Sequence, residues 1–164
     1  MTWPAYLVLA LVTLQRLGEL ILAERNTRRL LAKGAHEVGR GHYPFMVTVH
    51  AGWLIALWLL GPGPPIHVLP LIIYVALQFA RVWVIATLGE RWTTRIIILP
   101  GEPLVTHGPY RWLDHPNYLI VTAEIAVLPL VFGLPVVAAF FSVLNALILW
   151  VRLREENQAL AAHR

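Results

Sequence analysis

The sequence predicts an all-α membrane protein: a polytopic membrane helix bundle of about five transmembrane helices, forming a single domain over residues 1–164. Two observations lead to this prediction. The chain is 58% hydrophobic and only 13% charged, which is too apolar for an ordinary soluble domain. The apolar residues form long stretches separated by charge, proline and glycine. The chain contains no cysteine, so disulfides and thiolate chemistry are excluded.

The expected transmembrane spans cover about residues 3–22, 45–60, 66–88, 117–132 and 134–151. The first lacks a basic start and a small-residue cleavage site, so we expect a retained span and not a signal peptide. The third reaches about 34 Å at 1.5 Å per residue, enough to cross a bilayer. The last two divide an apolar tract that is too long for one crossing, and Pro129, Gly133 and Pro135 interrupt it.

The basic residues orient these spans. Outside the spans, Lys and Arg occur only in the first and third connections and the tail, at Arg25, Arg28, Arg29, Lys33, Arg40, Arg91, Arg95, Arg111, Arg152, Arg154 and Arg164. Five crossings place all of these on one side, which the positive-inside rule makes cytosolic. We therefore expect the N-terminus outside, the C-terminus in the cytosol, and the polar chemistry on the cytosolic face. The net charge of +4 then serves this anchoring and not nucleic-acid binding.

The third connection, residues 89–116, is long for a link in a compact membrane protein, and such loops are usually functional or disordered. Disorder is not expected, because Trp92 and Trp112 favour burial. Two polar motifs occur here, His107-Gly108-Pro109-Tyr110-Arg111 and His115-Pro116-Asn117-Tyr118. Proline suits the first turn of a helix, so the second motif places His115 at a helix cap, where free amides favour an anion. The alternative is that His115 and Tyr118 are only interfacial anchors.

The tail supplies a complementary charged segment that contains Arg152, Glu155, Glu156 and Asn157. Arg152 and Glu156 are four residues apart, share a helix face and can therefore pair. The alternative is a solvated amphipathic tail whose arginines hold the last helix in place.

Two charges lie within the predicted spans at matched depth. Arg81 and Glu124 are each seven residues from the inner end of their helix, roughly 10 Å deep. We expect them to pair with each other or to share contact with a polar ligand. Snorkelling and mutual pairing account for Arg16 and Glu19, and His50 is expected to be a satisfied bundle residue.

Several other classes of site lack support. The seven histidines show neither HxxxH nor HExxH spacing and no accompanying carboxylate cluster, so no metal site is expected. GxGxxG, P-loop and GxSxG motifs are absent from the sequence, which gives no support to nucleotide-binding or hydrolase functions.

These motifs, in this order, resemble those of the isoprenylcysteine carboxyl methyltransferase family of integral membrane methyltransferases. The bacterial branch found beside type III polyketide synthases is more similar still, through residues 89–95, Leu99-Pro-Gly101 and Glu124. The resemblance extends to the first connection and so covers nearly the whole chain. Two positions depart from the family pattern: Asp114 replaces the usual arginine before His-Pro, and Ile120 replaces a small residue.

The resemblance implies S-adenosylmethionine as the cofactor, bound on the cytosolic side of a bacterial inner membrane. It implies cofactor contacts at His107, Gly108, Pro109, Tyr110, Arg111, His115, Pro116, Asn117, Tyr118, Glu155 and Asn157. A lipophilic acceptor would enter from the bilayer, since a soluble cationic donor and an apolar acceptor meet only at an interface. Candidate acceptor contacts are Arg81, Glu124 and Trp92.

The implied reaction is O-methylation, an in-line displacement that requires an aligned nucleophile. The acceptor would be the hydroxyl of an alkyl-pyrone, resorcinol or quinone-like lipid, with a prenylcysteine-type carboxylate as the second possibility. Arg152 is the candidate cation for a carboxylate, and Glu156 or a nearby histidine is the candidate base for a hydroxyl. A different class of function, a non-catalytic transporter or lipid-binding subunit, remains an alternative, although transporters usually show paired repeats.

Overall fold

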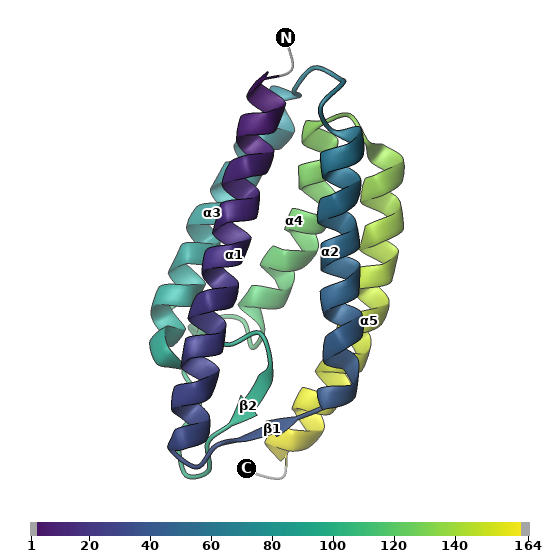
Figure 1. Ribbon diagram of the computed structural model, residues 1–164. Helices are drawn as coiled ribbons and strands as arrows, with labels where there is room; N and C mark the ends of the chain where they lie inside the picture. The colour runs from purple at the N-terminus through teal and green to yellow at the C-terminus, as the bar shows by residue number, and fades with distance from the viewer. Residues whose placement is uncertain (1–2, 162–164) are drawn as a thin grey trace.

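The computed structural model describes residues 3–161, and the side chains only as far as Glu156. These residues form the predicted all-α bundle, with helices α1 (Trp3–Ala32), α2 (Tyr43–Leu60), α3 (Val68–Leu88), α4 (Pro116–Val131) and α5 (Pro135–Ala161) (Figure 1). Four of them are long and apolar enough to cross a membrane. The prediction of a membrane helix bundle is confirmed.

Helix α4 is the short member of the bundle, with 16 residues. That length spans about 24 Å, less than the roughly 30 Å of a bilayer core. It packs between α3 and α5, and Ile125, Leu128 and Val131 on it are buried. They join a hydrophobic core that includes Leu9 and Leu57, from α1 and α2. Helix α4 is therefore an interior element that the neighbouring helices support.

Helix α1 continues well beyond the predicted end of its span at residue 22. The segment from residue 24 to 32 contains no proline or glycine and consists largely of good helix formers. Glu24 and Arg28 form an (i, i+4) ion pair of 2.9 Å along it. The helix ends just before Gly34, which has a φ of +93°. The first charged residues after residue 22 therefore mark where α1 leaves the membrane-spanning segment, and the helix itself continues to Ala32.

A two-stranded antiparallel sheet joins the first and third connections, which the sequence did not predict. Strand β1 (His36–Val38) pairs with β2 (Ile96–Ile98), with Glu37 opposite Ile97. Three consecutive isoleucines suit a strand, and Arg95 beside them contacts Glu37 at 3.1 Å. The sheet fixes both connections at one end of the bundle.

The two ends of the bundle differ in composition. The N-terminus and the α2–α3 and α4–α5 turns lie at the top of Figure 1, and the sheet and the end of α5 lie at the bottom. We call the latter the basic end, because the described Lys and Arg residues outside the predicted spans lie there or on the helix segments leading to it. Arg164 lies outside the described residues. The common end agrees with the predicted topology, and its assignment to the cytosol stays a prediction.

Candidate active site

A cavity of about 350 Å³ lies inside the bundle and is lined by residues of all five helices and of the segment before β2. This volume is within the range of small-molecule sites. Apolar side chains from α1, α2 and α5 form most of its wall, among them Leu17, Val47 and Ile148. Two clusters of polar side chains, here called the two polar groups, line it as well. One is at the basic end, near Tyr118, and the other surrounds Glu124, roughly 10 Å further along α4.

Arg152 is the cation at the basic end of the cavity. Its side chain is buried, with the residue 7% exposed. Its Nε donates to the Tyr118 hydroxyl at 2.7 Å, and its Nη1 donates to the Thr94 carbonyl at 2.7 Å and contacts Met46 Sδ at 3.1 Å. Each of these partners is neutral, and none of the described carboxylates forms an ion pair with Arg152. Buried charges are normally paired, so Arg152 can still bind an anion in the cavity.

The Tyr118 hydroxyl connects Arg152 to Glu156. It accepts a hydrogen bond from Arg152 and donates one to the Glu156 carboxylate. The His115 ring stacks on Tyr118 with centroids 5.1 Å apart, and its Nδ1 lies 3.7 Å from Glu156 Oε1. The sequence predicted a direct pair between Arg152 and Glu156. The structure instead turns the guanidinium toward the Thr94 carbonyl and inserts the tyrosine between the two charges.

Tyr110 also belongs to this polar group. Burial raises the pKa of its hydroxyl to about 12, and the negative charge of Glu156 contributes in the same direction. The hydroxyl therefore stays protonated at neutral pH and can donate a hydrogen bond.

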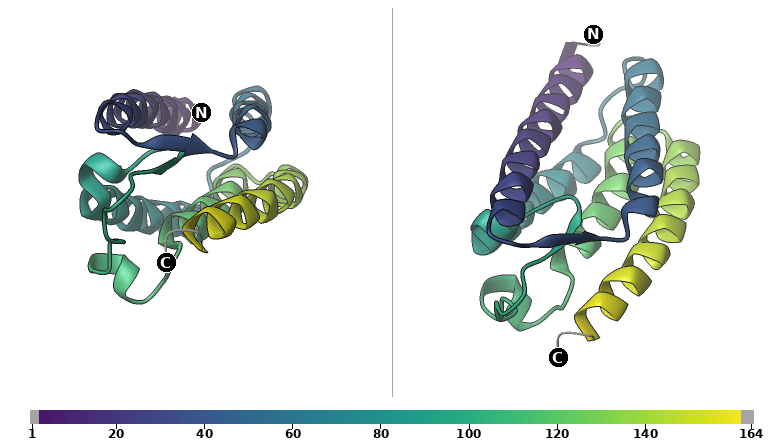
Figure 2. Two further views of the ribbon diagram at one scale, coloured as in Figure 1. Left: turned by 90° about the horizontal axis from the view of Figure 1, so that it is seen from below. Right: turned by 60° about the horizontal axis from the view of Figure 1, so that its bottom comes forward.

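The segment that contains Tyr110 packs against the end of α3 as a short 3-10 helix, η3 (Gly108–Arg111). Gly108 has a φ of +59°, and a Cβ there would lie 2.7 Å from Thr87 Oγ1, so only glycine fits this close approach. Figure 2 shows η3 and the end of α5 at the same end of the bundle. Trp112, after η3, is 68% exposed, contrary to the expected burial, and packs edge-on against Trp83. An exposed tryptophan suits the membrane interface.

The predicted cofactor residues fall into three groups. Asn117 and Tyr118 line the 350 Å³ cavity. Outside that cavity lie His107, Gly108, Pro109, Tyr110, Arg111, His115, Pro116 and Glu155, and so does Glu156, which was predicted as a catalytic residue. The side chain of Asn157 lies outside the described residues. Pro116 is the first residue of α4 and His115 is its N-cap residue, as predicted. The structure thus brings the His-Pro segment and the tail into contact, through Tyr118 and His115.

Two further polar atoms at the basic end of the cavity have no partner. Trp92, predicted as an acceptor contact, lines the cavity and is 2% exposed. Neither its Nε1 nor Asn117 Oδ1 has a hydrogen-bond partner within the described part of the chain. Buried polar atoms are usually paired, and an exception calls for an explanation such as a ligand. The basic end therefore offers a donor, an acceptor and a cation together.

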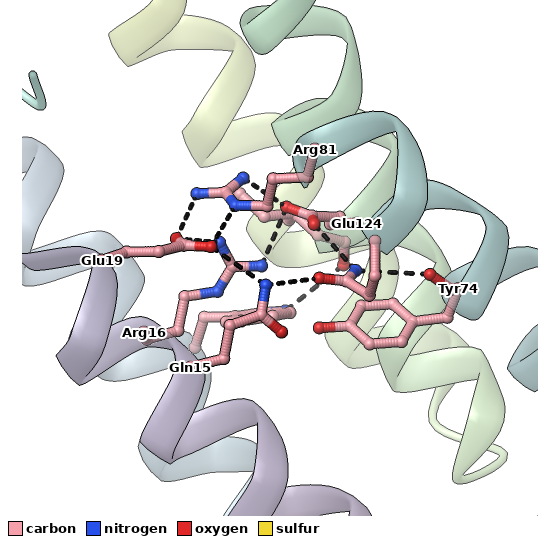
Figure 3. Close-up of polar contacts among 9 residues, drawn as sticks. Gln15, Arg16, Glu19, Tyr74, Arg81 and Glu124 are labelled. Carbon is pink, nitrogen blue, oxygen red and sulfur yellow. Dashed lines mark hydrogen bonds and ion pairs between the residues drawn. The ribbon is translucent and has the colours of Figure 1, made fainter. Parts of the chain in front are cut away.

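The deeper polar group is a closed network of charges from α1, α3 and α4 (Figure 3). Arg81 contacts Glu124 at 2.9 Å, which confirms the predicted pair, and also contacts Glu19 at 2.6 Å. Arg16 contacts both glutamates, with Glu124 at 2.9 Å. The explanation of Arg16 and Glu19 as a local pair was therefore incomplete, because both contribute to this interhelical network.

Two glutamines complete the network and leave it neutral. Gln78 donates to Glu124 at 2.9 Å, and Gln15 donates to Glu19 at 2.9 Å and to Gln78 at 2.7 Å. Two arginines and two glutamates sum to zero charge, so the desolvation cost of each ion is offset by close partners. His50 lies outside this network and bonds the Met46 carbonyl at 2.8 Å, as expected of a satisfied bundle residue.

Sequence reasoning missed the residues that the sheet places against the cavity. The Tyr43 hydroxyl lies 3.1 Å from Thr94 Oγ1, and the Arg95 guanidinium lies over the Tyr43 ring at 4.4 Å. These contacts join the start of α2 to the segment that follows Trp92. They depend on the long-range pairing of β1 with β2, for which the isoleucine run was the only local signal.

These features define an integral membrane protein with an internal cavity that is apolar along its sides and polar at the basic end. The model of the isoprenylcysteine carboxyl methyltransferase family matches residues 69–162. The chain belongs to this family. Its members use S-adenosylmethionine as methyl donor, so membership supports a multi-pass membrane methyltransferase.

Two relatives match nearly the whole chain. The uncharacterized protein YpbQ of Bacillus subtilis is 36% identical, over 94% of this chain and 95% of its own length. An uncharacterized protein of Haemophilus influenzae is 26% identical, over 89% of this chain and 88% of its own length. No solved structure matches.

Proposed function

We propose that this protein is an S-adenosylmethionine-dependent O-methyltransferase that acts on a lipophilic acceptor embedded in the membrane. The observation that carries the proposal is the buried, unpaired Arg152, which lies where the apolar cavity meets the polar loops of the basic end. A water-soluble donor can reach this point from one side and a lipid acceptor from the other.

The residues at this boundary fit the methyl donor, which carries a carboxylate, an ammonium group and hydroxyls. The Glu155 carboxylate can hold the cationic part, and Tyr110 and His115 can bond its polar groups. When bound, the donor supplies an electrophilic methyl group on a sulfonium. The predicted contacts of residues 107–111 and Glu155 with the donor belong to this proposal.

The 350 Å³ cavity would hold the acceptor, with its apolar part along α1, α2 and α5. The reacting oxygen would lie against Arg152 and Tyr118. A guanidinium beside an acidic hydroxyl favours the ionised form and so lowers its pKa. The proton passes from the acceptor to the Tyr118 oxygen while the Tyr118 proton passes to Glu156, which acts as the base. Asn117 and Trp92 orient the acceptor through their free polar atoms.

The path from Tyr118 to Glu156 favours a hydroxyl acceptor over a carboxylate, because only a hydroxyl has a proton to give up. This supports an alkyl-pyrone, resorcinol or quinone-like lipid, with a prenylcysteine-type carboxylate as the second possibility. Arg81 and Glu124 would contact a second oxygen of the acceptor. Since their network is neutral, it suits an uncharged group.

The proposed orientation places the basic end in the cytosol of a bacterial inner membrane. The clustering of Lys and Arg at that end supports it through the positive-inside rule. The donor then reaches the site from the cytosol, and no outer loop is required for catalysis.

The test is to incubate the purified protein in lipid nanodiscs with methyl-labelled S-adenosylmethionine and a lipid extract. We expect a labelled lipid ether or ester, whose identity gives the acceptor. Donor binding is measured in parallel by calorimetry. A protein that binds lipid but neither binds the donor nor labels any lipid would instead be the non-catalytic subunit.

A further inference from the structure

His50 lines the 350 Å³ cavity from α2 and lies between the two polar groups. It follows Met46 by four residues, and Met46 Sδ contacts Arg152 Nη1 at 3.1 Å. His50 is therefore one helical turn, roughly 6 Å, further from the basic end. The guanidinium groups of Arg16 and Arg81 act on its ring from the deeper polar group, as that of Arg152 does from the basic end. The imidazole thus faces the middle of the cavity.

Only one of the two ring nitrogens of His50 is paired. Nδ1 lies 2.8 Å from the Met46 carbonyl oxygen. A carbonyl can only accept, so Nδ1 carries the proton and donates it. In the neutral ring Nε2 is then a bare acceptor. Nε2 has no hydrogen-bond partner among the described residues and is not fully enclosed by protein atoms. Its lone pair is therefore open to a ligand in the cavity.

The charges around His50 leave no partner for an imidazolium. None of the described carboxylates forms an ion pair with His50, and the two in the deeper polar group are already bonded to arginines. A buried charge without a partner is costly, so the ring is neutral. A neutral imidazole whose Nδ1 proton is already donated can only accept through Nε2. Nε2 therefore recognises a hydroxyl, and not a carbonyl or an ether oxygen.

This chemistry restricts the part of the acceptor that lies beyond its reacting oxygen. With that oxygen at Arg152, the head group extends past His50 toward the deeper polar group. A second hydroxyl there donates to Nε2, and its oxygen can still face Arg81, since a hydroxyl both donates and accepts. A carbonyl or methoxy group there would leave Nε2 unpaired and bring two acceptors together.

We propose that His50 is a specificity-determining residue that selects an acceptor with a second hydroxyl group, which donates to Nε2 and is not methylated. This inference rests on the proposed function and defines its acceptor class as a lipid whose head group carries two hydroxyls. The oxygen at Arg152 bonds to the methyl carbon as the methyl–sulfur bond of the donor breaks, and its proton leaves through Tyr118 to Glu156. The hydroxyl at His50 keeps its proton.

One consequence is that the reaction stops after a single methyl transfer. The mono-methyl ether could react again only with its methoxy group at His50. A methoxy group has no proton to donate, so this orientation leaves Nε2 unpaired and is disfavoured.

The first test measures acceptor binding without the methyl donor. The ligands are an alkylresorcinol, which has two hydroxyls, and the alkylphenol of the same chain, which has one. Calorimetry with the full chain in phosphatidylcholine nanodiscs gives the two affinities. We expect the resorcinol to bind about tenfold more tightly, because the phenol can occupy only one of the two polar positions.

The second test measures methyl transfer from methyl-labelled S-adenosylmethionine. We expect the resorcinol to give only its mono-methyl ether. The purified mono-methyl ether, offered as acceptor, should react with a kcat/KM at least about tenfold lower than that of the resorcinol.

Three variants assign the preference to Nε2. His50→Leu removes the nitrogen, and should bind both ligands equally and form the dimethyl ether. His50→Gln places an amide oxygen at similar reach and should regain most of the preference. Thr48→Val is the matched control. Thr48 also bonds a carbonyl four residues back on α2, that of Pro44 at 2.9 Å, but its side chain does not line the cavity. Its loss should leave the preference unchanged.

Thermal melting of each variant establishes that it folds. Equal binding of the two ligands by wild type, an unchanged preference in His50→Leu, or a dimethyl ether from wild type would each overturn the proposal. The proposed function fails separately. A His50-dependent preference without methyl transfer would keep the recognition role and remove the enzymatic one, whereas equal methylation of both ligands would keep the enzyme and remove the role of His50.

Discussion

The two polar groups that line the central cavity differ in how completely they are paired. In the deep network, Arg16, Arg81, Glu19 and Glu124 satisfy one another and two glutamines close the remaining bonds. At the basic end, Arg152 has only neutral partners, and Trp92 and Asn117 each retain a free polar atom. A closed network mainly holds helices together and can contact an acceptor only through groups that already have partners, whereas an open one has unpaired groups available to a ligand.

The largest expected effect is a loss of stability when the closed network is broken. Glu124→Ala removes one of the two carboxylates that Arg16 and Arg81 share, so Glu19 alone remains to balance two buried guanidinium groups. We expect about 3–5 kcal/mol of destabilisation, measured by denaturation in detergent. The double variant Arg81→Leu with Glu124→Leu should recover part of this loss. A double variant less stable than Glu124→Ala would show that the charges are needed for more than mutual neutralisation.

The second-largest expected effect is a loss of methyl-transfer activity with little change in stability. Arg152→Ala removes the unpaired cation, and we expect methyl transfer to fall by about 100-fold to 1,000-fold, as for loss of a preorganised charge at a reacting oxygen. The melting temperature should change little, since no ion pair is broken. Arg154→Ala is the matched control, because that side chain is exposed and stacks on Trp150. Equal losses in both variants would assign the effect to the helix and not to the site.

A smaller effect is expected at the link between the two charges of the tail. Tyr118→Phe keeps the ring that stacks on His115 but removes the hydroxyl between Arg152 and Glu156. For a hydroxyl acceptor we expect kcat to fall about tenfold or more, with donor affinity preserved. Calorimetry of donor binding and initial rates measure the two quantities. An unchanged kcat would exclude proton transfer through Tyr118.

The smallest expected effect is a pH dependence from Tyr110. Its pKa is raised from the ordinary 10 to about 12, so the folded state holds this proton more tightly than the unfolded state does. The stabilisation is full below pH 10 and is lost as pH rises through 10 to 12. Tyr110→Phe should therefore flatten the alkaline loss of melting temperature slightly. A steeper loss in the variant would contradict the raised pKa.

The helices and the Arg81–Glu124 pair followed from the sequence because depth along a helix can be counted. Helical spacing also placed Arg152 and Glu156 on one face. It could not show that the Thr94 carbonyl, brought in by the sheet, would turn the guanidinium aside. Residue spacing along a helix gives the depth of a side chain in the bundle. Contacts between segments that are distant in the sequence are known only from the folded structure.

The deep network also sets an order for building the protein into a membrane. Helix α1 carries Arg16 and Glu19 three residues apart, so it can enter the bilayer with its charges already matched. Helix α3 brings Arg81, whose partner Glu124 lies 43 residues further along the chain. A lone arginine in hydrocarbon is costly. Arg81 therefore depends on Glu19 until synthesis reaches α4, and docking of α3 onto α1 would precede completion of the bundle.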